Sequence, residues 1–357
     1  MSKKKIVALG GDGIGIEVMD ATCAILEKSG FNLEIIKPLH GAAAIKAQNN
    51  PFPDESKDLC DESDAILFGA AEGPSIAILI YLRWLLDNYI NLRPIKYYPG
   101  THSPIKDPEG TNYYIIRENS EGLYPGREGD LPWMAQNLAN YKDPFGRSLD
   151  YYGAGKFSLL LTTEKGTQRL ARFTSDFAMK RKAAGFPGKV TCITKSNVLS
   201  QTGGLFKKII EEEIKAHSEL TFDHYYVDDF ARRIVRNPQQ FDVAVTTNMF
   251  GDILADGAAE VVGGLGIAPS ACLGGKKAYF EPVHGTAPDI AGKGIANPTA
   301  MILSAKMMLE YLGLQGEADS LEKAVAEVYR KGISLTGDQG GKATTKEFAD
   351  VVLKHIR

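Results

Sequence analysis

The chain has 357 residues, of which 44% are hydrophobic and 24% charged, and its 41 Lys and Arg against 44 Asp and Glu give a net charge of -3. This length suits two domains with well-formed cores, and the composition excludes a disordered or fibrous chain. The near balance of charge removes the electrostatic argument for nucleic acid or an anionic membrane as the main partner.

Strand-like and helix-like segments alternate along the chain, which is typical of an α/β fold with substantial parallel sheet. In the first third we expect strands at Lys5–Leu9, Asn32–Ile36, Ala65–Phe68 and Tyr113–Asn119, and helices at Ile16–Ser29 and about Ile76–Tyr89. Further on we expect strands at Val190–Ile193, Asp223–Val227 and Val243–Thr246, and helices at Gly204–Ala216, Asn297–Leu312 and Ser320–Lys331. The region from about Tyr97 to Ala154 is richer in Pro, Gly, Asn and Tyr, which predicts a domain transition near Pro99 and Gly100.

The sequence contains no sign of a membrane span or a disulfide framework. No stretch approaches the roughly 18 consecutive apolar residues of a spanning helix, and the apolar run at the N-terminus is too short for the core of a signal peptide. The four cysteines are scattered without a CxxC pair, so we expect buried thiols in a reducing cytosol rather than disulfides or a zinc site. They are Cys23, Cys60, Cys192 and Cys272.

A glycine-rich loop from Gly10 to Gly15 separates the first expected strand from the first helix. Backbone amides in such a loop could approach a phosphate. The spacing is not GxGxxG, however, and no acidic residue ends the second strand to hold a ribose, as a Rossmann site requires. We therefore interpret the loop mainly as a tight structural turn, with at most edge contacts to a cofactor.

Three arginines lie in otherwise apolar or strand-like segments: Arg83, Arg93 and Arg117. A half-buried guanidinium without a partner costs several kcal/mol. Three of them close together predict a pocket for a small substrate with more than one carboxylate. The alternative is a structural ion pair, because Glu118 and Glu121 stand beside Arg117 in the sequence.

Aliphatic residues precede the first of these arginines at helical spacing. Ile76, Leu79 and Ile80 stand seven, four and three residues before Arg83, so a regular helix places all four on one face. Taken alone, this pattern favours a core-facing stripe with an arginine at its rim.

Two pairs of aspartates are candidate metal ligands. Asp252 and Asp256 are four residues apart in an expected helix, and Asp228 and Asp229 end a strand-like segment. Adjacent carboxylates repel each other unless a cation or protons neutralise them. Oxygen ligands at this spacing suit Mg2+ or Mn2+, although a pair of aspartates on a solvated helix face is the common alternative.

Candidates for proton transfer follow two of the strands. Lys195 stands at the carboxyl end of an expected strand, where α/β enzymes place their chemistry, and Asn197 follows two residues later. A lysine near a cation loses proton affinity and can act as a general base, and Tyr124 is a candidate acid. Taken singly, each is more commonly a surface lysine or a packed tyrosine.

Together these motifs resemble the metal-dependent β-decarboxylating dehydrogenases that act on isocitrate, 3-isopropylmalate, homoisocitrate, tartrate and D-malate. The matching stretches run the length of the chain and include GGDGIGIEV, YLRWLLDNYINLRP, IIRENSEGLYPG, TKSNVLSQTGGLF, NMFGDILAD and EPVHGTAPDIAGKGIANP. The resemblance implies an α/β fold with a doubly wound mixed sheet, not a true Rossmann fold, and a second, smaller α/β dimerisation domain. It divides the chain into a large cofactor-binding domain, residues 1–98 plus 252–357, and a small domain, residues 99–251, with an arm-like insertion near 127–152.

The resemblance also assigns roles to residues at matching positions. Tyr124 and Lys195 are the implied catalytic residues, and a homodimer with shared active sites takes Lys195 and Asp228 from the partner subunit. Mg2+ or Mn2+ is bound by Asp228, Asp252 and Asp256. The substrate is bound by Arg83, Arg93, Arg117, Tyr124, Lys195, Asn197 and Asp228, with Ile76, Leu79 and Ile80 toward its C3 substituent. NAD is bound by Ile14, Glu281, His284, Gly285, Thr286, Ala287, Asp289, Ile290 and Asn297.

The implied reaction is oxidation of the C2 hydroxyl of a 3-substituted malate, followed by loss of the C3 carboxylate. Asp289 and Ile290 stand where NADP users of the family have lysine and tyrosine, so we expect NAD. Leu79 and Ile80 offer a substrate no hydrogen-bond donor, which favours a 3-alkylmalate, first 3-isopropylmalate, because burying a carboxylate against them is costly.

Other substrates and one other class of function stay open. Isocitrate or homoisocitrate is a close alternative, because YYPGTHSPIKDPE and RENSEGLYPG resemble bacterial isocitrate dehydrogenase and a helix bulge could bring Ser75 into reach. D-malate or tartrate, and a regulatory subunit without turnover, are lesser alternatives.

Overall fold

The computed structural model describes residues 2–356 as a mixed α/β protein. Its strands are β1 Lys4–Gly11, β2 Leu33–Ile36, β3 Ala65–Ala70, β4 Ile90–Lys96, β5 Asn112–Glu118, β6 Glu128–Asp130, β7 Lys156–Ser158, β8 Lys189–Thr194, β9 Thr221–Tyr226, β10 Val243–Thr246, β11 Pro269–Leu273 and β12 Tyr279–Pro282. Its α-helices are α1 Ile14–Lys28, α2 Gly41–Gln48, α3 Asp54–Glu62, α4 Ile76–Ile80, α5 Leu131–Asn137, α6 Glu164–Ala183, α7 Thr202–Lys215, α8 Val227–Arg236, α9 Asn248–Val262, α10 Thr299–Tyr311, α11 Gln315–Lys331 and α12 Thr345–His355.

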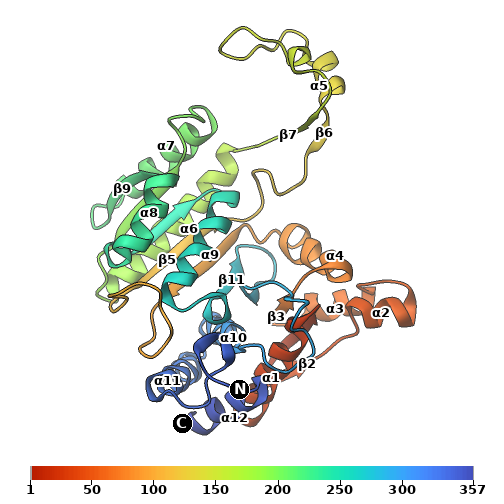
Figure 1. The fold of residues 1–357 in the computed structure, drawn as a ribbon, viewed down its shortest axis with the longest axis vertical. Helices are drawn as coiled ribbons and strands as arrows, with labels where there is room; N and C mark the ends of the chain where they lie inside the picture. The colour runs from red at the N-terminus through yellow and green to blue at the C-terminus, as the bar shows by residue number, and fades with distance from the viewer. Residues whose placement is uncertain (1, 357) are drawn as a thin grey trace.

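One large mixed sheet organises the molecule, as the sequence predicted. Within the described residues its ten strands run in the order β2-β1-β3-β12-β11-β4-β5-β10-β8-β9. The pairs β12–β11, β11–β4 and β4–β5 are antiparallel, and the other pairs are parallel. Figure 1 shows the N- and C-terminal elements together at one end and the middle of the chain at the other. The division into two domains at residues 98 and 252 stays a prediction.

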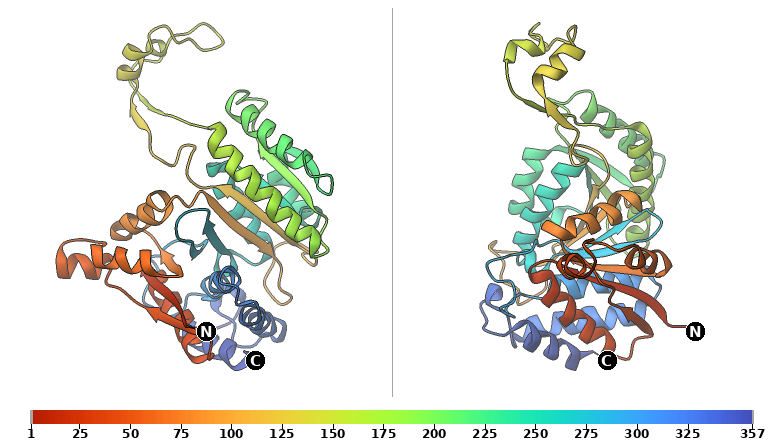
Figure 2. Two further views of the ribbon diagram at one scale, coloured as in Figure 1. Left: turned by 180° about the vertical axis from the view of Figure 1, so that it is seen from behind. Right: turned by 90° about the vertical axis from the view of Figure 1, so that its right-hand side faces the viewer.

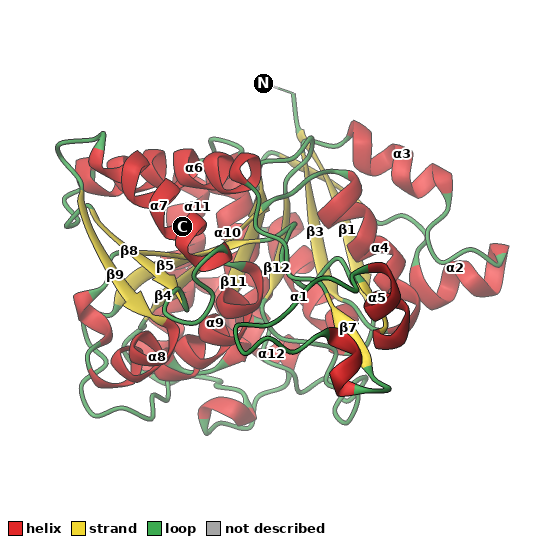
Figure 3. Cartoon of the chain, turned by 90° about the horizontal axis from the view of Figure 1, so that it is seen from above, coloured by secondary structure: helices red, strands yellow, loops and turns green. Residues whose placement is uncertain are grey.

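Helices cover both faces of the sheet (Figure 3). The helices α1, α6, α7, α10, α11 and α12 contribute to one hydrophobic cluster, whereas α8 and α9 pack against the opposite face in another. Strand alternation distributes β4 between the two, because Ile90 and Leu92 join the first cluster and Ile95 the second. Arg93 therefore lies on the face that α9 covers.

The helix that begins at Ile76 differs from the prediction. It changes to a π-helical turn at Tyr81–Leu85 and does not reach Tyr89. The amide of Leu86 donates to the Tyr81 carbonyl at 3.0 Å, five residues back instead of four. Residues before and after Tyr81 therefore do not share one 3.6-residue spacing. A smaller correction concerns Asp228 and Asp229, which begin α8 instead of ending a strand.

An arm projects from the body of the protein (Figures 1 and 2). The short strands β6 and β7 pair antiparallel at its base and lead to α5. Large apolar side chains are exposed along it, among them Trp133, Tyr141 and Phe145, the last 80% exposed. The insertion predicted near residues 127–152 lies in this arm, and its contact with a second subunit stays a prediction.

The structure also bears on the cysteines and on membrane spans. All four cysteines are buried and free, as predicted. Across residues 2–356, no helix has the length and apolar character needed to cross a membrane.

Candidate active site

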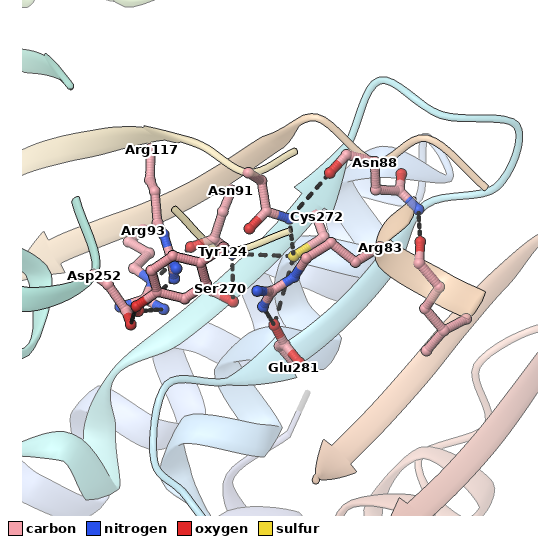
Figure 4. A network of polar contacts seen from close by, with 12 residues as sticks. Arg83, Asn88, Asn91, Arg93, Arg117, Tyr124, Asp252, Ser270, Cys272 and Glu281 are labelled. Carbon is pink, nitrogen blue, oxygen red and sulfur yellow. Dashed lines mark hydrogen bonds and ion pairs between the residues drawn. The ribbon is translucent and has the colours of Figure 1, made fainter. Parts of the chain in front are cut away.

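The three predicted arginines converge in one buried cluster (Figure 4). Arg93 on β4 and Arg117 on β5 point to the same face of the sheet, and Arg83 comes from the π-helical turn. Their exposed fractions are 7% for Arg83, 6% for Arg93 and 1% for Arg117. Burial and the nearby Arg93 lower the pKa of Arg117 to about 10, so it stays charged at neutral pH.

Two aspartates from one face of α9 pair with Arg93 and Arg117. Asp252 Oδ1 accepts a hydrogen bond from Arg93 Nη2 at 3.0 Å and another from Arg117 Nη1. Asp256 Oδ1 accepts from Arg93 Nη1 at 3.1 Å. Although burial alone would raise the pKa of Asp252, Arg117 and Arg93 hold it below the usual value. Burial raises the pKa of Asp256.

Tyr124 completes this side of the cluster. Its hydroxyl donates to Asp252 Oδ2, and its ring lies 4.8 Å from the Arg117 guanidinium. Burial and the hydrogen bond to Asp252 raise the pKa of the Tyr124 hydroxyl. The phenol therefore keeps its proton at neutral pH.

The alternative partner for Arg117 is wrong. Glu118 instead accepts from the backbone amides of Ser120 and Glu121, each at 2.8 Å. Arg117 donates to Asn248 Oδ1 through Nη2 at 2.7 Å, in addition to Asp252. Its partners thus come from α9 and not from its own strand.

Two asparagines that the sequence analysis did not select hold the arginines in place. Asn91 Oδ1 accepts from Arg93 Nε at 2.5 Å, and its amide donates to Cys272 Sγ at 3.0 Å (Figure 4). Asn248 fixes Arg117 from the first turn of α9. Spacing could have indicated both residues. Asn91 precedes Arg93 by two residues on a strand and Asn248 precedes Asp252 by four on a helix, so each shares a face with a site residue.

Glu281, predicted to bind the cofactor, lies beside Arg83. Its Oε1 is 4.0 Å from Arg83 Nη2. Burial raises the pKa of Glu281. Arg83 Nε is buried and has no hydrogen-bond partner among the described residues.

The aliphatic residues before Arg83 do not share one environment. Ile76 and Ile80 are 47% and 43% exposed. Leu79 packs against the core cluster that contains Leu82. The π-helical turn follows all three residues, so it interrupts only their helical spacing to Arg83 and does not account for the differences among them.

Lys195 and Asp228 lie together but apart from the arginine cluster. Lys195 Nζ is 2.5 Å from Asp228 Oδ1, and their side chains are 30% and 65% exposed. The hydrogen bond from Lys195 lowers the pKa of Asp228. In residues 2–356, no ion pair links this pair to Asp252 or Asp256, and no group of three or more His, Cys, Asp or Glu could hold a metal. Asn197 is exposed in the turn after Lys195.

A cavity of about 460 Å³ lies where the cofactor was predicted. Of the predicted residues, Ile14, His284, Ile290 and Asn297 line it, whereas Gly285, Thr286, Ala287, Asp289 and Glu281 do not. His284 Nε2 is buried without a hydrogen-bond partner in the described chain, and burial lowers its pKa, so the ring is neutral.

The sequence analysis missed a carboxylate in this cavity. Asp338 lines it and accepts from Asn297 Nδ2 at 2.9 Å. Asp289, which was predicted to bind the cofactor, is exposed and directly precedes Ile290 of the cavity wall.

The opening glycine loop supports the segment that carries His284. Gly13 has φ 58°, and a Cβ added to it would lie 2.1 Å from the Thr286 carbonyl oxygen. The amide of Ile14 donates to that same oxygen at 2.9 Å. These contacts fit the interpretation of the loop as a structural turn. They also hold the segment around Thr286, which follows His284 of the cavity wall, in place.

Comparison with known proteins identifies the family. The model of the isocitrate/isopropylmalate dehydrogenase family matches residues 5–352. The chain is 43% identical over 353 residues to a 3-isopropylmalate/3-methylmalate dehydrogenase of Methanocaldococcus jannaschii, covering 99% of both. It is 41% identical over 360 residues to an isocitrate/homoisocitrate dehydrogenase of Thermus thermophilus, covering 99% and 98%. The crystal structure of isocitrate dehydrogenase from Methylococcus capsulatus superimposes with a TM-score of 0.86 at 36% identity over 99% of both chains. The chain belongs to the isocitrate/isopropylmalate dehydrogenase family.

Proposed function

We propose that this protein catalyses the NAD-dependent oxidative decarboxylation of a 3-substituted malate, with 3-isopropylmalate or a related 3-alkylmalate as its substrate. The observation that carries the proposal is the buried cluster of Arg83, Arg93 and Arg117 with Tyr124 and Asp252. A site with three guanidinium groups suits a substrate with two carboxylates, because guanidinium and carboxylate form paired hydrogen bonds.

The substrate exchanges partners with the aspartates when it binds. Arg93 and Arg117 both donate to Asp252 Oδ1. Carboxylates of the substrate take over these donors, and the aspartate oxygens become available for another cation. The asparagines behind the arginines keep the guanidinium groups oriented during the exchange, since Arg93 Nε stays bonded to Asn91.

The acidic residues fit a divalent cation. Three arginines stand against the carboxylates of Asp252, Asp256 and Glu281, so a dianionic substrate adds negative charge that the side chains alone do not balance. Asp252 and Asp256 supply the oxygen ligands that Mg2+ or Mn2+ prefers, and Asp228 of a second copy would supply a third. When bound, the ion would supply Lewis-acid stabilisation of negative charge on a substrate oxygen.

Two side chains move protons. Lys195 of a second copy, deprotonated where a nearby cation lowers its proton affinity, would accept the proton of the C2 hydroxyl. NAD, when bound, would supply the hydride acceptor. After CO2 departs, the Tyr124 hydroxyl gives its proton to C3. The raised pKa of Tyr124 suits this role, because the phenol must be protonated beforehand.

The cavity beside His284 is the proposed NAD site. His284 Nε2 offers an unsatisfied polar atom to the cofactor. Asp289 does not line the cavity itself but is exposed next to Ile290, which does, and a carboxylate there would repel a 2'-phosphate, so NAD is favoured over NADP. Ile14, Ile290 and Asn297 line the wall, and Glu281, beside Arg83, lies toward the substrate.

We propose a homodimer with shared sites. The Lys195–Asp228 pair is exposed within one chain, and apolar side chains beside both halves of the site are exposed too: Val198 by 68% and Ile253 by 65%. A second copy that covers these residues would bring its Lys195 and Asp228 to Asp252. The arm around residues 127–152 offers it a second contact.

A second candidate is isocitrate or homoisocitrate, which the name of the Thermus thermophilus relative favours. The structure gives this substrate less support. Ser75 is fully buried. Its hydroxyl points to Gly41 of α2, since a Cβ built on Gly41 would lie 3.1 Å from Ser75 Oγ. The exposed residues are Ile76 and Ile80, which carry no donor for a third carboxylate.

The test is a steady-state comparison of 3-isopropylmalate, isocitrate, homoisocitrate, D-malate and tartrate with NAD and Mg2+. We expect the highest kcat/KM for 3-isopropylmalate. A higher value for isocitrate or homoisocitrate would move the assignment to the second candidate. No NADH from any of them would favour a regulatory subunit without turnover.

A further inference from the structure

A second cavity lies behind the arginine cluster. It has a volume of about 180 Å³ and is lined by residues of β4, β5 and β11 and of the helices α6, α9, α10 and α11. We call it the back cavity, and its polar lining consists of Lys96, Tyr98, Asn112, Tyr114, Arg181, Lys306 and Glu322, with the Tyr98 hydroxyl donating to Glu322 Oε1 at 2.7 Å.

Strand alternation separates the back cavity from the active site. In the antiparallel pair β4–β5, Pro94 is opposite Tyr114 and Lys96 is opposite Asn112, and these four residues line the cavity. Arg93 and Arg117 occupy the alternate positions on the same two strands and point to the other face. The two sites therefore share their wall but no side chain.

The charges that line the back cavity are mainly positive. Lys96, Arg181 and Lys306 stand against a single carboxylate, Glu322, which is 2.7 Å from Lys96 and 3.2 Å from Lys306. Although burial alone would raise it, Lys306 and Lys96 hold the pKa of Glu322 at about 2. The other acids that pair with these cations, Glu310 and Asp242, do not line the cavity.

Two hydrogen-bond donors on residues that line the cavity have no partner in the described chain, and both atoms reach solvent. Arg181 is 7% exposed, and its Nε and Nη2 donate to Asp242 at 2.5 Å and to the Asn112 carbonyl at 3.0 Å. Its remaining nitrogen, Nη1, has no hydrogen-bond partner among residues 2–356. The Tyr114 hydroxyl likewise makes no hydrogen bond in the described chain, and the Tyr114 ring packs 4.8 Å from the Arg181 guanidinium.

We infer that the back cavity binds a small anion through Arg181 Nη1 and the Tyr114 hydroxyl. A cationic lining with free donors selects a carboxylate or phosphate group. The volume is close to that of a cavity of about 150 Å³ known to hold benzene, so the ligand has roughly six to eight non-hydrogen atoms. Such a ligand would bridge α6 to α10 and α11. The inference does not depend on the proposed reaction, because it uses none of the reaction's residues.

The test measures anion binding by the full-length protein. Inorganic phosphate and malonate are titrated separately by calorimetry, which distinguishes the two groups, and crystals are soaked in selenate to locate the anion by anomalous scattering. Tyr114→Phe removes only the hydroxyl and keeps the ring. Ala268→Met fills the cavity, because Ala268 is part of its wall.

We expect a selenium peak in the back cavity and about tenfold weaker binding of the preferred anion in Tyr114→Phe, the size of one lost hydrogen bond to a charged group. Ala268→Met should abolish this binding. If that variant does not fold, Tyr114→Phe alone decides. Selenate found only at Arg83, Arg93 and Arg117, or phosphate and malonate affinities unchanged by Tyr114→Phe, would overturn the inference.

Discussion

Shortening Ile80 tests whether the exposed isoleucines contact the C3 substituent of the substrate. Burying an isoleucine side chain completely stabilises a complex by about 1.5–3 kcal/mol. Ile80 is 43% exposed, so a substrate can cover at most this fraction. Ile80→Ala should therefore cost about 1 kcal/mol of transition-state binding, or about fivefold in kcat/KM for 3-isopropylmalate.

The assay compares two substrates in the same variant. D-malate has no substituent at C3, so its kcat/KM should not change when Ile80 is shortened, and the ratio of the two values isolates the alkyl contact. Ile45→Ala is the matched control, because Ile45 is 39% exposed on α2, outside the site. Leu79→Ala gives a second contrast. Leu79 packs on the core, so its loss should lower the free energy of unfolding by about 2 kcal/mol and leave the substrate ratio unchanged.

A ratio of the two kcat/KM values that is unchanged in Ile80→Ala, whether both values fall equally or neither falls, would refute this placement of the alkyl group. A change in the substrate ratio of Leu79→Ala would show that Leu79 contacts the alkyl group, contrary to its packing on the core.

Further predictions concern stability, the cofactor and the dimer. Glu322 has a pKa of about 2 in the folded protein against 4.5 for the free side chain, so its stabilisation is present above pH 4.5 and lost as the pH falls toward 2. Glu322→Gln should lower the free energy of unfolding in urea by at most about 3 kcal/mol at pH 7. The difference from the wild type should narrow below pH 4.5, and a difference independent of pH would contradict this prediction. Asp289→Lys with Ile290→Tyr should raise the kcat/KM ratio of NADP to NAD, whereas equal values for both cofactors in the unaltered protein would exclude NAD preference. Arg117→Ala and Lys195→Ala should each be inactive alone, but refolding them together should restore about a quarter of the wild-type activity, since half of the dimers are mixed and each has one intact site. No recovery would argue against shared sites.

Seven of the twelve strands in residues 2–356 and the charged site residues could be predicted because their signals are local, whereas β4, β6, β7, β11 and β12 were not expected. The expected strand Val243–Thr246 begins with three apolar residues, as expected for a strand buried on both faces, and the structure has β10 with these bounds. Asp252 and Asp256 lie side by side because a helix brings residues four apart to one face. The arginines were recognisable as charges inside apolar segments.

Other elements lacked such a signal. The helix α6 was not predicted, because the face it buries is made largely of small residues, such as Ala171, Thr174 and Ala178, which give no pattern of large apolar side chains. The π-helical turn depends on which carbonyl the amide of Leu86 selects, and residue types alone do not determine that choice. The partners of Arg117 come from α9, more than a hundred residues away, and only the packing of the fold brings them together.

The pairing register of β4 and β5 places the polar residues of the site on one face of these two strands and apolar core residues on the other. Asn91, Arg93 and Arg117 share one face, because Asn91 is opposite Arg117 in the antiparallel pair. A shift of one residue in either strand would turn these polar groups into the core that contains Ile90 and Leu92. Burying guanidinium groups there without partners would cost several kcal/mol each. The carboxylates of α9 remove that penalty on the observed face alone, so the ion pairs that prepare the site also favour the register that forms it.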